Sequence, residues 1–200
     1  MLLLVLSGNF LVMFFGWELV GLSSYLLISF WSEKKSAARA GNKAFILNRI
    51  GDFGFLIGLM IILNEFQTFN FLRIFESSLE TKPENLDVII VFLLLGAFGK
   101  SAQFPLFSWL PDAMEGPTPA SALIHAATMV TAGVFMLVRI SPILQFSELG
   151  SLIIISMGLL TALIAAFAAI NQKDIKKVLA YSTISVSYTH LRAHETSVQR

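Results

Sequence analysis

The chain of 200 residues has no cysteine and few charged side chains. The lack of thiols excludes disulfides, thiolate metal sites and cysteine-ligated iron–sulfur clusters. Charged residues make up 14% of the chain, whereas soluble domains average about 25%. The formal net charge of +1 gives no electrostatic basis for binding nucleic acid. Neither a cysteine-ligated redox centre nor a nucleic-acid partner is therefore expected.

Binding motifs for nucleotides and metals are missing as well. The sequence has no glycine-rich phosphate loop, and Gly51-Asp-Phe-Gly54 lies inside an apolar run instead of following a strand. No second histidine or carboxylate near His125 has the spacing of a metal site. We therefore expect no cofactor and no metal on this chain.

What the chain does contain is apolar sequence in long runs. Hydrophobic residues make up 56% of it, and its mean hydropathy is +0.75. About 20 apolar residues cross a bilayer, and in lipid such segments satisfy their backbone hydrogen bonds as helices. The sequence therefore predicts an all-α, polytopic membrane helix bundle surrounded by the lipid bilayer.

About five spans are expected after a stub at residues 1–8, which reads as the end of an incomplete helix. No basic residues precede the first apolar run, so no secretory signal is expected. The expected spans are residues 10–31, 44–64, 87–109, 119–139 and 149–170.

Basic residues predict the orientation of these spans. The connections 32–43 and 171–177 hold most of them and would lie on one side, cytoplasmic or matrix. Asp112 and Glu115 would lie at the surface on that side. On the other side, residues 68–80 are too polar to span. Phe69, Leu72 and Phe75 are spaced like one helical face, so this segment is either an interfacial helix or a solvated loop.

Lys100 is the most informative residue, because it lies deep in an expected span. A lysine at the bilayer centre costs about 2.5–3.5 kcal/mol, so it needs a partner or a function. Pro105 crowds the carbonyl of Ser101, which predicts a kinked or open helix near residues 100–111. A buried lysine whose carboxylate partner can move could switch a proton; the alternative is a permanently paired structural lysine.

The first and second expected spans also hold ionisable residues. Glu18 has Gly16 and Gly21 beside it, so another helix can approach and pair with it. It could serve as a counter-ion alone or take part in ion transfer. Arg49 and Asp52, three residues apart on a helix, could form a self-neutralising local pair or a pair that separates and modulates a nearby proton.

His125 lies in the fourth expected span. At α-helical spacing it shares a polar face with Ser121 and Thr128. Histidine titrates near neutral pH and can relay protons. A satisfied interhelical histidine is the alternative. Lys100, Glu18, His125, Asp52 and Arg49 are thus the candidate proton-transfer residues, with Pro105 at the helix break.

Several motifs carry a family resemblance that covers most of residues 8–185. They are Gly16-Trp-Glu-Leu-Val-Gly-Leu-Ser-Ser-Tyr-Leu-Leu-Ile28, Leu47-Asn-Arg-Ile-Gly-Asp52, residues 99–133 from Gly-Lys-Ser-Ala-Gln-Phe-Pro onward, and Asp174-Ile-Lys-Lys-Val-Leu-Ala-Tyr-Ser-Thr183. The chain resembles the chain 5 family of NADH:ubiquinone oxidoreductase, the antiporter-like, proton-pumping membrane subunits of respiratory complex I. The shorter motifs are shared with related antiporter subunits.

The resemblance implies an internal fragment of a larger subunit built from two inverted five-helix repeats. It implies that Glu18 pairs with the pump lysine Lys100 on a discontinuous helix, and that Asp52 and Arg49 form the modulating pair. His125 would bridge toward the next half-channel. NAD, FMN, iron–sulfur clusters and quinone would belong to partner subunits, with other complex I membrane subunits as neighbours. The location would be the mitochondrial inner membrane or a bacterial plasma membrane.

The last residues depart from the family pattern. Residues 186–200 are polar where the family continues as an apolar helix, so we interpret them as a non-native tail after a transmembrane antiporter-like domain at 1–185. His190 and His194 are accordingly given no role.

The predicted function is proton translocation coupled to NADH oxidation and quinone reduction elsewhere in the complex, so the chain would be a subunit of an enzyme. The alternative is a subunit of a multisubunit sodium/proton antiporter, and a third class is a structural scaffold with static charge pairs. The run Leu47-Asn-Arg-Ile-Gly-Asp52, followed by Phe-Gly-Phe, favours complex I.

Overall fold

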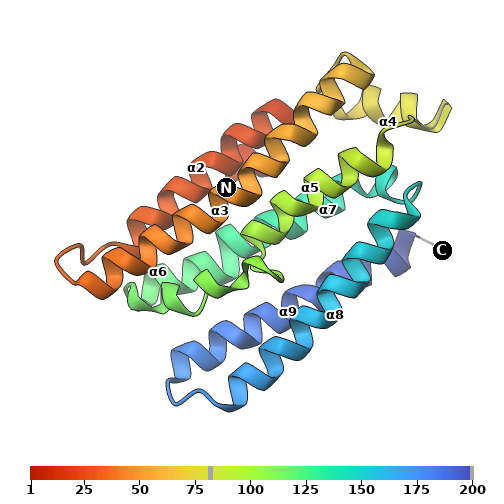
Figure 1. Ribbon diagram of the computed structural model, residues 1–200. Helices are drawn as coiled ribbons and strands as arrows, with labels where there is room; N and C mark the ends of the chain where they lie inside the picture. The colour runs from red at the N-terminus through yellow and green to blue at the C-terminus, as the bar shows by residue number, and fades with distance from the viewer. Residues whose placement is uncertain (81–82, 199–200) are drawn as a thin grey trace.

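The computed structural model describes residues 1–80 and 83–198 of the chain, and its regular elements there are helical (Figure 1). This confirms the predicted all-α bundle. The α-helices are α1 (Leu2–Val5), α2 (Phe10–Ile28), α3 (Lys35–Phe66), α4 (Phe71–Glu80), α5 (Leu86–Lys100), α6 (Thr118–Ala122), α7 (Met129–Leu144), α8 (Glu148–Ile170) and α9 (Ile175–Val198). Two 3-10 turns, Leu106–Trp109 and Asp112–Glu115, follow α5, and a π-helical turn, Leu123–Thr128, joins α6 to α7.

Four helices in the described part of the chain are long and apolar enough to cross a membrane. They are α2, α3, the continuous segment Thr118–Leu144 and α8. The expected third span, 87–109, is not one helix, because α5 ends at Lys100 after 15 residues. At 1.5 Å per residue that length falls short of the roughly 30 Å hydrocarbon core. The irregular segment after Lys100 continues beside α3 toward the end of the bundle that holds the α2–α3 turn (Figure 1).

Helix α3 begins at Lys35, well before the expected start at residue 44. Lys35, Arg39 and Lys43, which we expected in a loop, lie on its first turns and are exposed. The reason is local, because residues 35–43 are rich in Ala, Lys and Arg, which favour helix. Ala37, Ala40 and Gly41 are buried on the opposite face, so packing extends the helix beyond its apolar part.

The connections expected on one side of the membrane do lie at one end of the bundle. The α2–α3 and α8–α9 turns are together there, and α4 is at the other end (Figure 1). Asp112 is at the basic end, where its carboxylate lies 2.6 Å from Lys43 Nζ with both side chains 42% exposed. Ser36 donates a hydrogen bond of 3.1 Å to Glu115. Both acidic residues are at the surface, as predicted.

Most of the segment 68–80 is helical, as α4 runs from Phe71 to Glu80, so the solvated-loop alternative is wrong. The predicted apolar face is wrong as well. Phe71 and Ile74 are buried, whereas Leu72 is 70% exposed. Phe71 packs on Phe10 with the ring centroids 4.5 Å apart, and this contact sets which face of α4 turns inward. A membrane-surface position for α4 stays a prediction.

Helix α9 continues to Val198, through most of the segment 186–200 that we interpret as a non-native tail. Residues 199–200 lie outside the described part of the chain. Ala180 and Ile184 of α9 are buried in the same core cluster as Ala165 of α8. The foreign origin of the tail stays a prediction.

Candidate proton-transfer site

The centre of the site is a buried ion pair between α5 and α3. Lys100 Nζ lies 3.2 Å from both carboxylate oxygens of Asp52. The two side chains are 1% and 5% exposed. A buried pair of this kind is stabilising only when the charges are well compensated, so the surroundings of both residues matter.

Two glycines explain why these charges meet. Gly51 precedes Asp52 on α3, and Gly99 precedes Lys100 on α5. A Cβ on Gly51 would lie 3.1 Å from the Gly99 Cα, so the two backbones are nearly in contact. This close approach of the two backbones therefore brings the next residue of each helix into the same place.

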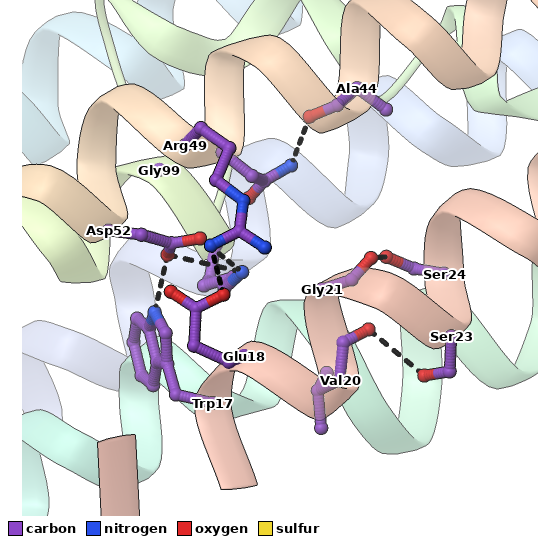
Figure 2. Close-up of polar contacts among 12 residues, drawn as sticks. Trp17, Glu18, Val20, Gly21, Ser23, Ser24, Ala44, Arg49, Asp52 and Gly99 are labelled. Carbon is purple, nitrogen blue, oxygen red and sulfur yellow. Dashed lines mark hydrogen bonds and ion pairs between the residues drawn. The ribbon is translucent and has the colours of Figure 1, made fainter. Parts of the chain in front are cut away.

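Trp17 of α2 is the second partner of Asp52. Its indole Nε1–H donates a hydrogen bond of 2.7 Å to Asp52 Oδ1 (Figure 2). The Lys100 ammonium lies 5.7 Å from the centre of the Trp17 ring, within cation–π range. Phe55 packs against the same ring edge-on at 5.1 Å. Our sequence analysis missed Trp17; the signal was a donor-bearing aromatic next to an intramembrane glutamate.

Gly21 makes room for the lysine. A Cβ at this position would lie 2.7 Å from Lys100 Nζ. The sequence predicted close helix packing at Gly21. The structure shows that the atom in that space is the ammonium group itself.

A second ion pair lies beside the first and is more open. Glu18 of α2 pairs with Arg49 of α3, and Figure 2 shows the guanidinium over the carboxylate. Their side chains are 21% and 45% exposed. Arg49 also lies over the Phe45 ring at 4.9 Å.

These pairings correct two expectations. Lys100 pairs with Asp52 and not with Glu18, and Arg49 pairs with Glu18 and not with Asp52. The physical reason is the face of α3 that each residue occupies. Asp52 is on the buried face toward α5, whereas Arg49 is on the exposed face. Glu18 directly follows Trp17, which donates to Asp52, so the two ion pairs lie side by side.

The helix break predicted near residues 100–111 is confirmed, and the last helical residue before it is Lys100. Ala102 after it has φ of 51°, in the left-handed region. The polar groups of the break are bonded from several directions. Trp109 Nε1 donates to the Gly99 carbonyl at 3.1 Å, Ser101 donates to the Val130 carbonyl at 3.0 Å, and the Phe104 amide donates to Thr161 Oγ1 at 2.9 Å.

His125 lies in the π-helical turn between α6 and α7. The predicted polar stripe assumed α-helical spacing, which this turn interrupts. The hydroxyls of Ser121 and Thr128 bond the carbonyls of Pro117 and Leu123. The Nε2 atom of His125 is buried and has no hydrogen-bond partner among the described residues. The relay role and the satisfied-histidine alternative both stay predictions.

Known proteins share the sequence and the fold of this chain. A family model described as NADH:quinone oxidoreductase/Mrp antiporter, transmembrane, matches residues 7–190. NADH-ubiquinone oxidoreductase chain 5 of Acanthamoeba castellanii is 54% identical over 92% of this chain and 29% of its own length. NADH-quinone oxidoreductase subunit L of Neisseria meningitidis is 50% identical over the same shares.

A solved structure also matches the fold. The Mrp complex from Dietzia sp. DQ12-45-1b contains a chain that superposes with a TM-score of 0.87 at 32% identity, covering 96% of this chain and 23% of that one. The present chain spans under a third of the length of the curated relatives named above. It is an integral membrane protein of the mitochondrial inner membrane or a bacterial plasma membrane. By its family match and its relatives, the chain belongs to the NADH:quinone oxidoreductase/Mrp antiporter transmembrane family.

Proposed function

We propose that this chain is part of a proton-translocating membrane subunit of an NADH:quinone oxidoreductase. In that complex it would couple NADH oxidation and quinone reduction in other subunits to proton transport. The observation that carries the proposal is the buried Lys100–Asp52 pair, which adjoins a second, more exposed pair. The names of its relatives at 50% identity and above support the same function.

The mechanism follows from the cost of an uncompensated charge. While Asp52 is at 3.2 Å, the ammonium of Lys100 has its counter-charge. When Asp52 is drawn away, a buried cation is left alone, and proton release removes that charge. Arg49 is the residue that can draw it, because three residues along a helix allow contact.

Exchange of partners is the step that would link the two pairs. In the described arrangement Arg49 is held by Glu18. If Glu18 is attracted elsewhere, Arg49 becomes available to Asp52, and Lys100 loses its anion. This revises the simpler scheme in which the Glu18–Lys100 pair itself opens.

The trigger would come from a neighbouring membrane subunit. Glu18 and Arg49 are partly exposed between apolar residues such as Ile46 and Ile50, which are 59% and 48% exposed. Charged side chains that face lipid inside a membrane span are costly. We therefore expect another subunit to cover this face and to supply the change in charge that attracts Glu18. NAD, FMN, iron–sulfur clusters and quinone would belong to partner subunits.

His125 is proposed as the next proton carrier. Its buried Nε2, without a partner among the described residues, is available to accept or donate a proton. The π-helical turn that carries it lies between α6 and α7. Helix α7 contacts the break after Lys100, because Ser101 donates a hydrogen bond to the Val130 carbonyl of α7.

The test is Lys100→Ala in the full-length subunit of the assembled complex. The proton-to-electron ratio measured in sealed membrane vesicles should fall, while the complex still assembles. Lys43→Ala, at an exposed ion pair, is the matched control and should leave the ratio unchanged. An unchanged ratio for Lys100→Ala would overturn the proposed mechanism.

A sodium/proton antiporter is the second candidate, favoured by the match to the Mrp complex. Sodium-dependent proton movement in vesicles without NADH would support it. A static scaffold predicts instead that Lys100 and Glu18 can be neutralised together with coupling preserved.

A further inference from the structure

Thr161 is a buried polar residue in α8, a span whose other inward residues are small or apolar. Its exposure is 1%. Its hydroxyl donates a hydrogen bond of 2.5 Å to the Met157 carbonyl and accepts one of 2.9 Å from the Phe104 amide. One hydroxyl hydrogen and one lone pair are thereby used, which fixes the rotation of the group.

The Phe104 amide belongs to the broken segment after Lys100. Where a helix stops, the amides that follow lose their regular carbonyl partners and need others. Ser101 and Gln103 still bond back to Ala97 and Phe98 of α5. Phe104 is the next amide along, and it bonds across to a different helix.

Helix α8 also holds the start of α5. Ser147, at the N-cap of α8, donates a hydrogen bond of 2.5 Å to Asp87 in the first turn of α5. The two helices run in the same direction through the bundle (Figure 1). Side-chain hydrogen bonds from α8 therefore reach α5 near its first residue and just beyond its last.

We infer that Thr161 is a positioning residue for Lys100, holding the break from α8 and passing movements of α8 to the end of α5. This deepens the proposed function and rests on it for the role of Lys100. Because Ala180 and Ile184 of α9 are buried with Ala165 of α8, the same contact would link Lys100 to the following part of the subunit.

The matched variants are Thr161→Val, which removes the hydroxyl at nearly constant size, and Thr161→Ser, which keeps it. Thr183→Val is the control, since that hydroxyl is bonded within α9 to the Leu179 carbonyl. All are made in the full-length subunit of the assembled complex. Thr161→Ala, which cannot clash, is used if the valine variant fails to assemble.

Two readouts separate the outcomes. Amide hydrogen exchange at Phe104 should become roughly two- to tenfold faster in Thr161→Val, as expected for loss of one hydrogen bond. The proton-to-electron ratio should fall in the same variant. Thr161→Ser and Thr183→Val should match the wild type in both readouts.

Unchanged exchange at Phe104, an unchanged ratio, or equal losses in the valine and serine variants would each overturn the inference. Lys100→Ala is measured in parallel to keep the two proposals apart. If Lys100→Ala lowers the ratio and Thr161→Val does not, the proposed function stands and the positioning role falls. If Lys100→Ala leaves the ratio unchanged, the proposed function falls, while exchange at Phe104 still reports on the contact.

Discussion

Asp52 and Lys100 form an ion pair at 3.2 Å in which each residue follows a glycine where the backbones of α3 and α5 nearly touch. A buried ion pair is often no more stabilising than well-packed apolar residues. Its presence here, next to the more open Glu18–Arg49 pair, therefore argues for a role in charge movement more than in stability.

Removing one partner of the buried pair should be costly. Asp52→Asn leaves the Lys100 ammonium buried without an anion, which typically costs about 3–5 kcal/mol. Thermal unfolding of the purified complex should show a clear loss of stability. Asp112→Asn breaks an exposed pair and should cost about 0.2–1 kcal/mol. Similar losses for both variants would contradict the burial argument.

Removing both partners should separate stability from transport. In Lys100→Met with Asp52→Leu, apolar side chains of similar volume replace the pair, and stability should recover to within about 1–2 kcal/mol of the wild type. The proton-to-electron ratio should remain low, because no titratable group replaces Lys100. Recovery of both stability and transport would favour the static scaffold.

Trp17 should matter through its indole N–H. Trp17→Phe keeps an aromatic ring beside Phe55 but removes the 2.7 Å hydrogen bond to Asp52. A hydrogen bond to a charged group contributes about 1.5–3 kcal/mol, so Asp52 should leave Lys100 more easily. We expect an altered proton-to-electron ratio in assembled complex, measured against Phe55→Leu, which removes only the neighbouring ring. Equal effects of the two variants would point to packing alone.

Much of the fold could be predicted because lipid imposes simple rules. Apolar run lengths gave the long helices, and Pro105 with Lys100 indicated the break. The errors lie where tertiary contacts decide: α3 extends to Lys35 because Ala37 and Ala40 are buried, and α4 turns Phe71 inward because Phe10 lies opposite.

The site was predicted as a set of residues but not as a set of contacts. Spacing along one helix showed that Arg49 could reach Asp52, yet the pairing depends on which face of α3 meets α2 and which meets α5. The Thr161–Phe104 hydrogen bond has no sequence pattern either, because it joins residues 57 positions apart in the chain. The π-helical turn at His125 also was not predicted from the sequence.

Gly21 offers the most selective test of ammonium position. In Gly21→Ala the added Cβ would lie 2.7 Å from Lys100 Nζ. Because Nζ is the end of a flexible side chain, the ammonium can move while the helices stay in place. A misplacement of about 1 Å at a reacting group can lower a rate up to 100-fold, so proton transport should fall strongly while assembly is normal.

The matched control for this substitution is Gly8→Ala. A Cβ there meets no atom within 4 Å, so transport should equal that of the wild type. Normal transport in Gly21→Ala would mean that the ammonium can be displaced without consequence, and the position of Lys100 against Asp52 would then not control proton transfer. Loss of assembly in Gly21→Ala alone would instead show that the helices, not the lysine, had yielded.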